Sequence, residues 1–153
     1  MKSKRHPPTF CLLFLIFINF IQPSLASDLD KEKRWAEQIS DSLLDGEAIQ
    51  LSNGTHDFLA IETQAEDPND LGVIVLHGIG IHPDWSAVIQ PLRVQLAEAG
   101  WNTLSLQLPV LKNEAEGKDY EPLMSEVPTR IDAGIRHLAK QGNKKIAIVA
   151  HSM

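Results

Sequence analysis

The hydrophobic pattern of the second half of the chain consists of three apolar segments rich in β-branched residues and leucine, at residues 73–76, 103–108 and 145–150. Such segments are typical of strands that are covered on both faces of a sheet. Two stretches with apolar residues at helical spacing separate them. One begins near Pro91 and ends at Gly100, and the other covers residues 127–138. This alternation of strand and helix predicts right-handed crossovers and parallel strands.

The chain before these segments predicts a helix and then an antiparallel hairpin. Residues 28–44 carry apolar side chains at every fourth position, which is the spacing of one helix face. Residues 48–51 and 57–62 read as two short strands. Asn53 and Gly54 lie between them, and this pair favours a tight hairpin turn. The expected fold class is therefore α/β, with a mixed, mostly parallel sheet and a leading β-hairpin.

The first 26 residues have the pattern of a secretory signal peptide. A basic start precedes an apolar run at residues 10–21, Pro23 breaks the run, and Ala26 closes a stretch of small residues. An uncleaved membrane anchor is the alternative, but the run is shorter than the roughly 20 residues that cross a bilayer. We therefore expect export without an integral span after cleavage. The destination is the periplasm in a Gram-negative cell and the extracellular space otherwise.

Composition and charge indicate how the chain is stabilised and which classes of binding partner are disfavoured. Hydrophobic residues make up 43% of the chain, so it can bury a core. Cys11 is the only cysteine and lies in the signal segment, so the mature chain has no disulfide to use. Cleavage would leave 11 basic residues against 20 acidic ones, a net charge near −9. This charge argues against nucleic acid and against anionic membrane surfaces as partners.

The candidate nucleophile is Ser152, which follows the strand at residues 145–150. A buried strand that leads directly into a small residue, any residue and serine is how a nucleophile elbow begins. Ala150 is the small residue here, and His151 is the neighbour whose side chain should point away from the serine. The second small position would come after Met153. By itself, a His-Ser pair after a strand is also compatible with an ordinary loop.

The segment His77-Gly78-Ile79-Gly80 follows the strand at residues 73–76. Its presence favours a nucleophile elbow over an ordinary loop at Ser152. In serine hydrolases of the α/β type, the loop at this place donates one backbone N–H to the oxyanion hole, and the residue after the nucleophile donates the other. We expect Ile79 and Met153 to be these two donors. The glycines at 78 and 80 would allow the backbone to approach the substrate closely.

Two other uses of this loop are weaker. Gly78 and Gly80 could open a dinucleotide-binding glycine pattern, but the third glycine position holds Pro83, which lacks an N–H. His82 and Asp84 could suggest a metal pair, yet two ligands in a proline-containing turn are too few for a site. We expect Asp84 to cap a turn or helix, and we expect neither a metal nor an organic cofactor.

Chain order limits the role of the histidines. In this type of hydrolase the acid and the catalytic histidine follow the serine, so both should lie beyond residue 153. His77 is then expected to brace the oxyanion loop by hydrogen bonding. Residues 112–122 are expected to form a solvated loop, with a substrate-gating flap as the minor alternative.

The segments Val75–Trp85 and Gly100–Pro109 resemble those of exported, α/β-hydrolase-like bacterial proteins of unknown function. The similarity extends from about Arg34 to the end of the chain. It implies an α/β-hydrolase fold with a serine site, and it implies no particular substrate.

These observations give three regions: a signal peptide (1–26), an N-terminal helical segment (27–47), and the N-terminal half of an α/β-hydrolase domain that stops at the elbow (48–153). We expect a cell-envelope serine hydrolase of the esterase, thioesterase or amidase type. Its substrate would be a small-molecule or lipid-like ester, and the pattern leaves the oligomeric state open. The chain alone should be inactive. The alternative is a non-catalytic envelope protein that uses the same fold as a binding scaffold.

Overall fold

The computed structural model describes residues 27–67 and 69–152. The signal peptide expected at residues 1–26 and the oxyanion donor expected at Met153 lie outside the described residues. The helices and strands occur in the order α1 (Leu29–Ser42), β1 (Glu47–Ser52), β2 (Asp57–Thr63), β3 (Leu71–Leu76), α2 (Ile89–Glu98), β4 (Asn102–Leu106), η1 (Gly117–Ser125), α3 (Val127–Lys140) and β5 (Lys145–Ala150).

The strands form one sheet in the order β1-β2-β4-β3-β5. β2 is antiparallel to both β1 and β4, whereas β3 is parallel to β4 and to β5. Four strands therefore run in the same direction and β2 alone runs against them. This mixed, mostly parallel sheet with a leading hairpin is the fold class that the sequence predicts, and the prediction is confirmed.

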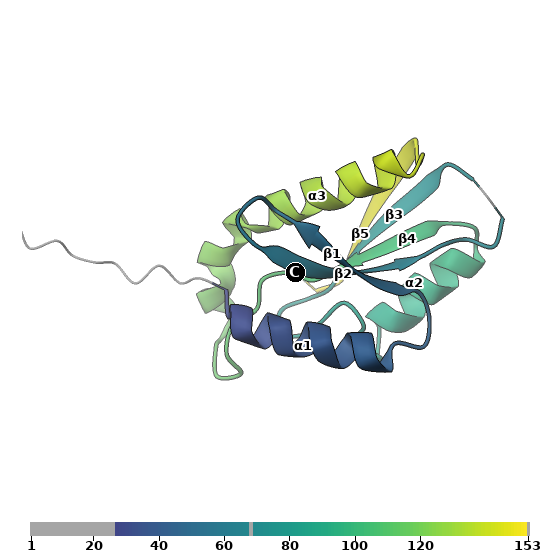
Figure 1. Ribbon diagram of the computed structural model, residues 1–153. Helices are drawn as coiled ribbons and strands as arrows, with labels where there is room; N and C mark the ends of the chain where they lie inside the picture. The colour runs from purple at the N-terminus through teal and green to yellow at the C-terminus, as the bar shows by residue number, and fades with distance from the viewer. Residues whose placement is uncertain (1–26, 68, 153) are drawn as a thin grey trace, which may run out of the picture.

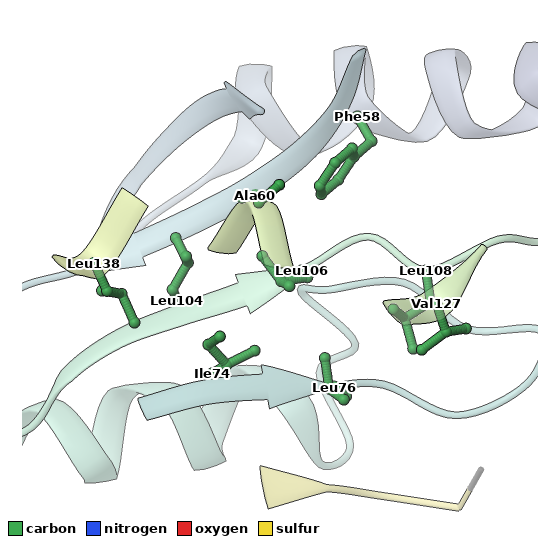
Figure 2. Packing of buried hydrophobic residues seen from close by; sticks show 10 residues of the cluster. Phe58, Ala60, Ile74, Leu76, Leu104, Leu106, Leu108, Val127 and Leu138 are labelled. Carbon is green, nitrogen blue, oxygen red and sulfur yellow. The ribbon is translucent and has the colours of Figure 1, made fainter. Parts of the chain in front are cut away.

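Helices cover both faces of the sheet (Figure 1). α1 and α2 lie on one face and α3 lies on the other. Alternate residues of β2 pack into the cores on the two faces of the sheet, because successive side chains of a strand point to opposite faces. Leu59 and Ile61 pack with Ile39 of α1. On the α3 side, ten buried residues of four elements and one loop form the main core (Figure 2): Phe58, Ala60, Ile74, Leu76, Leu104, Leu106, Leu108, Val127, Ala133 and Leu138.

Most expected elements occur within a few residues of their predicted bounds. α2 begins at Ile89, two residues before Pro91, so the proline falls in the first helical turn, where a missing N–H is tolerated. Gly100 follows α2 with a φ of +90°, the left-handed conformation that ends many helices. No helix among residues 27–67 and 69–152 is long and apolar enough to cross a bilayer.

The last strand differs from its expected environment. β5 was expected to be covered on both faces, but each of its residues is exposed or half-buried, and Ile148 is 48% exposed. β5 lies at the end of the strand order and pairs on one side only, with β3. The apolar pattern of β5 thus predicts the strand correctly but not its burial. Within the described residues, the outer edge of β5 has no partner strand.

The segment after β4 is also more ordered than a solvated loop. Residues Gly117–Ser125 form the 3₁₀ helix η1, in which Tyr120 and Leu123 are buried. They pack with Leu111 in a small core of their own. The Tyr120 hydroxyl accepts a hydrogen bond from the Leu111 amide at 3.1 Å. The many charged residues of this segment suggest a solvated loop, whereas the packing of Leu111, Tyr120 and Leu123 holds it against the domain.

Gly134 brings α3 close to the sheet, and we expect Gly134→Val to lower the free energy of unfolding by about 1–3 kcal/mol. A Cβ at this position would lie 3.1 Å from Leu106 Cδ1 and 3.3 Å from Ile74 Cδ1, so the larger side chain would push the helix away. Urea unfolding of the intact protein measures the effect. Ala139→Val, at an exposed site of the same helix, is the matched control and should change stability by about 0.5 kcal/mol or less. Equal effects of the two substitutions would contradict this account.

Candidate active site

Ser152 lies just after β5 and has a φ of +53°. Among the described residues it is the only non-glycine residue with a positive φ. Residues other than glycine, asparagine and aspartate rarely adopt this left-handed conformation, and it tends to persist where the surrounding structure imposes it at functional sites. The side chain is exposed to solvent. The backbone at Ser152 thus has the unusual conformation that a nucleophile elbow requires.

The loop after β3 contacts this turn directly. β3 and β5 are adjacent and parallel, so their carboxyl ends meet at the same edge of the sheet. The His151 amide donates to the Leu76 carbonyl oxygen at 3.0 Å. A Cβ on Gly78 would lie 2.7 Å from the Ser152 carbonyl oxygen and 3.1 Å from the Ser152 Cβ. Only glycine fits between the two segments at this point.

Gly80, the other glycine of the loop, is favoured at its position for a different reason. Gly80 has a φ of +75° and open space around the position of a Cβ, so conformation and not crowding favours glycine there. Ile79, between the two glycines, has a side chain that is 42% exposed. Ile79 thus directly follows the glycine that packs against Ser152, and its side chain lies at the surface.

His77 is buried beneath this loop, with 1% of its surface exposed. Its Nε2 accepts a hydrogen bond from the Leu108 amide at 2.9 Å. An amide can only donate, so the ring proton is on Nδ1, which donates to the Gly78 carbonyl oxygen at 2.8 Å. Burial lowers the pKa of His77 to about 4, although the hydrogen bond to Gly78 opposes the shift. His77 is thus a neutral brace between the loop after β3 and the segment after β4.

A buried ion pair, which the sequence pattern does not predict, supports the same segment. Arg130 of α3 is fully buried and donates to the Glu32 carboxylate at 2.8 and 3.1 Å. It also donates to the Gln107 carbonyl oxygen at 2.9 Å and to His56 Nε2 at 3.0 Å. Arg130 therefore joins α1, the hairpin turn and α3 to the backbone next to Leu108. One signal was available: Arg130 shares the apolar stripe of α3 with Val127 and Gly134, where a charge needs a buried partner.

A second buried arginine binds the far end of the loop between β3 and α2. Arg93 of α2 is fully buried, and its guanidinium contacts the Asp84 carboxylate at 2.6 and 3.1 Å. Asp84 is thus an ion-pair partner of Arg93. His82 lies between the rings of Trp35 and Trp85 in edge-on contacts, and its Nδ1 accepts a hydrogen bond from the Asp84 amide at 3.2 Å. Desolvation lowers the pKa of His82 as well.

Comparison with known proteins gives a family and a fold. The model of a family described as "Protein of unknown function (DUF3530)" matches residues 22–122. No curated protein matches the chain at a significant level.

Several solved structures are similar to this chain. They include Est1E from Butyrivibrio proteoclasticus (TM-score 0.55, 18% identity, 71% of this chain and 41% of that one). An alpha-beta serine hydrolase homologue from Coxiella burnetii has a TM-score of 0.53 at 15% identity and covers 72% of this chain and 53% of its own. The esterase Pf2001 from Pyrococcus furiosus has a TM-score of 0.52 at 15% identity and covers 73% and 44%. The chain spans about half or less of each of these structures, and the likeness shows the α/β-hydrolase fold.

Proposed function

Because this chain belongs to the DUF3530 family of proteins of unknown function and has the α/β-hydrolase fold, we propose that it carries the nucleophile of a serine hydrolase. The reaction would be acyl transfer from an ester, thioester or amide. The observation that carries the proposal is the left-handed Ser152 held against Gly78 at the carboxyl end of β5. This geometry brings a strained, exposed serine against the loop after β3, whose Ile79 amide is the proposed oxyanion donor.

In the proposed reaction, the Ser152 oxygen attacks the carbonyl carbon and its proton passes to a histidine beyond residue 153. The carbonyl π electrons move to oxygen, and the amides of Ile79 and Met153 stabilise the resulting oxyanion. The protonated histidine then donates its proton to the leaving group, which departs and leaves an acyl-serine that water hydrolyses. His77 does not act as the base, because both of its ring nitrogens are engaged with backbone groups.

The proposal places this hydrolase in the cell envelope, with a small-molecule or lipid-like ester as its substrate. The support for export is the signal-like pattern of residues 1–26. The support for an ester is that one of the similar structures is an esterase.

A fluorophosphonate probe tests the nucleophile. The full-length protein, which includes the proposed histidine beyond residue 153, should become labelled, and Ser152→Ala in that protein should reduce labelling to background, since the probe reacts only with an activated serine. Ser86→Ala is the matched control, because Ser86 is exposed in the same oxyanion loop and should label like the wild type. Labelling that survives in Ser152→Ala would disprove the role of Ser152. A folded full-length protein that never labels would favour the non-catalytic scaffold instead.

A further inference from the structure

The residues around the start of α1 are bound to the segment that follows β4. The Asp28 amide donates to the Val110 carbonyl oxygen at 2.7 Å, and the Val110 amide donates to the Ser27 hydroxyl oxygen at 3.2 Å. The Lys31 ammonium donates to the Leu111 carbonyl oxygen at 2.7 Å. Ser27 is only 8% exposed. The residue that directly follows the expected cleavage point is therefore buried in the fold.

Ser27 also borders a buried cluster of charged groups. Its hydroxyl donates to the Glu32 carboxylate, which pairs with the Arg130 guanidinium at 2.8 Å. A second carboxylate, that of Glu126, lies 3.5 Å from the same guanidinium. His56 accepts a hydrogen bond from Arg130 through Nε2, so its ring is neutral in this arrangement. Two carboxylates against one guanidinium leave this cluster with one net negative charge, and a buried charge is costly without a partner.

Cleavage after Ala26 supplies a cation at this place. Hydrolysis of the Ala26–Ser27 peptide bond leaves the oxygen of a water molecule on Ala26 as part of a carboxylate. The Ser27 nitrogen takes both hydrogens of that water and becomes an α-ammonium, the main form of such a group at neutral pH. In any serine the backbone nitrogen lies within about 4 Å of the hydroxyl oxygen. The ammonium would thus lie within roughly 7 Å of the Glu32 carboxylate, which the Ser27 hydroxyl contacts.

We propose that Ser27 is the first residue of the mature protein and that its α-ammonium completes the buried cluster of Glu32 and Arg130. This inference goes beyond the proposed hydrolase reaction, does not involve Ser152, and rests on the proposed export. Removal of residues 1–26 then stabilises the fold. Because Ser27 is buried, the peptide bond must be cut before the start of α1 binds the segment after β4.

The first test is the N-terminus of the full-length protein after expression with residues 1–26 and recovery from the cell envelope. Its intact mass and N-terminal sequencing should show that it begins at Ser27. A folded product that keeps residues 1–26, or that begins at another residue, would overturn the inference.

The reactivity of the α-amine tests its burial. An N-hydroxysuccinimide ester at pH 7 should modify the Ser27 amine at least tenfold more slowly in the folded mature protein than in urea, because an ion-paired ammonium is protonated and shielded. Lys33 is the control, because its side chain is exposed on the same helix and should react at similar rates in both states. Equal rates for Ser27 in the two states would show that its amine is free.

A double-mutant cycle identifies the partner of the ammonium. A mature protein that retains Ala26 carries its ammonium one residue too early, so it should melt about 2–4 °C below the protein that begins at Ser27. In a Glu32→Gln background, the retained Ala26 should shift the melting temperature by about 1 °C or less. Asp30→Asn removes an exposed carboxylate of the same turn and is the matched control, in which the full shift should remain.

Each outcome of these experiments is independent of the nucleophile. An equal shift with and without the Glu32 carboxylate would overturn the proposed pairing. If Glu32→Gln does not fold, the protection of the Ser27 amine still decides the question. Labelling of Ser152 by a fluorophosphonate is a separate result, so either proposal can fail while the other stands.

Discussion

Replacing Arg130 with methionine is expected to lower the free energy of unfolding by about 3–5 kcal/mol, which is the usual effect of breaking a buried ion pair. The substitution leaves the Glu32 carboxylate, which is 5% exposed, without its cationic partner. It also removes the donor to the Gln107 carbonyl oxygen and to His56. Urea unfolding of the intact protein at pH 7, followed by circular dichroism, measures the loss.

Two further variants show whether the buried charge is the cause. Glu126 also contacts Arg130, but at 3.5 Å and with a side chain that is 29% exposed, so Glu126→Gln should change stability by about 1 kcal/mol or less. Adding Glu32→Leu to Arg130→Met should recover much of the lost stability, because no unpaired charge then remains. A loss below about 1 kcal/mol in Arg130→Met, or a double variant weaker than the single one, would contradict the account.

The local hydrophobic pattern and the expected direction of the strands predict part of the site. Gly78 and Ser152 each follow a strand that the hydrophobic pattern reveals, and parallel strands bring such ends to one edge of a sheet. The pattern gave no strand order. The contact between Gly78 and Ser152 depends on β3 and β5 being neighbours, which becomes visible only in the sheet.

The remaining parts of the site depend on contacts between distant residues. Glu32 and Arg130 are 98 positions apart, and no spacing rule connects a charged residue of the first helix to one of the last. η1 was missed because its helical pattern is masked by charged and turn-forming residues, while its stability comes from Tyr120 and Leu123 packing beneath it. In both places burial against a remote segment overrides the local preference of the sequence.

Acid is expected to destabilise the protein through His77. The pKa of His77 is about 4 in the folded protein, whereas an unfolded histidine titrates near 6.5. Above pH 6.5 the ring is neutral in both states and the full stability is present. As the pH falls from 6.5 towards 4, the unfolded state takes up a proton that the folded state resists. The free energy of unfolding then falls by up to about 1.4 kcal/mol per pH unit, and the loss levels off at about 3 kcal/mol below pH 4.

His77→Gln isolates this contribution, because glutamine also carries one donor and one acceptor but does not titrate. Urea unfolding at pH 7 and at pH 5 should show the stability difference between the wild type and His77→Gln shifting by about 2 kcal/mol in favour of the variant at the lower pH. Carboxylates that titrate in the same range affect both proteins equally and cancel. His151→Gln changes an exposed ring and should follow the wild type at both pH values. Parallel stability curves for the wild type and His77→Gln would mean that His77 can be protonated in the folded protein, so that acid would remove the hydrogen bond from Leu108 and leave the oxyanion loop without its brace.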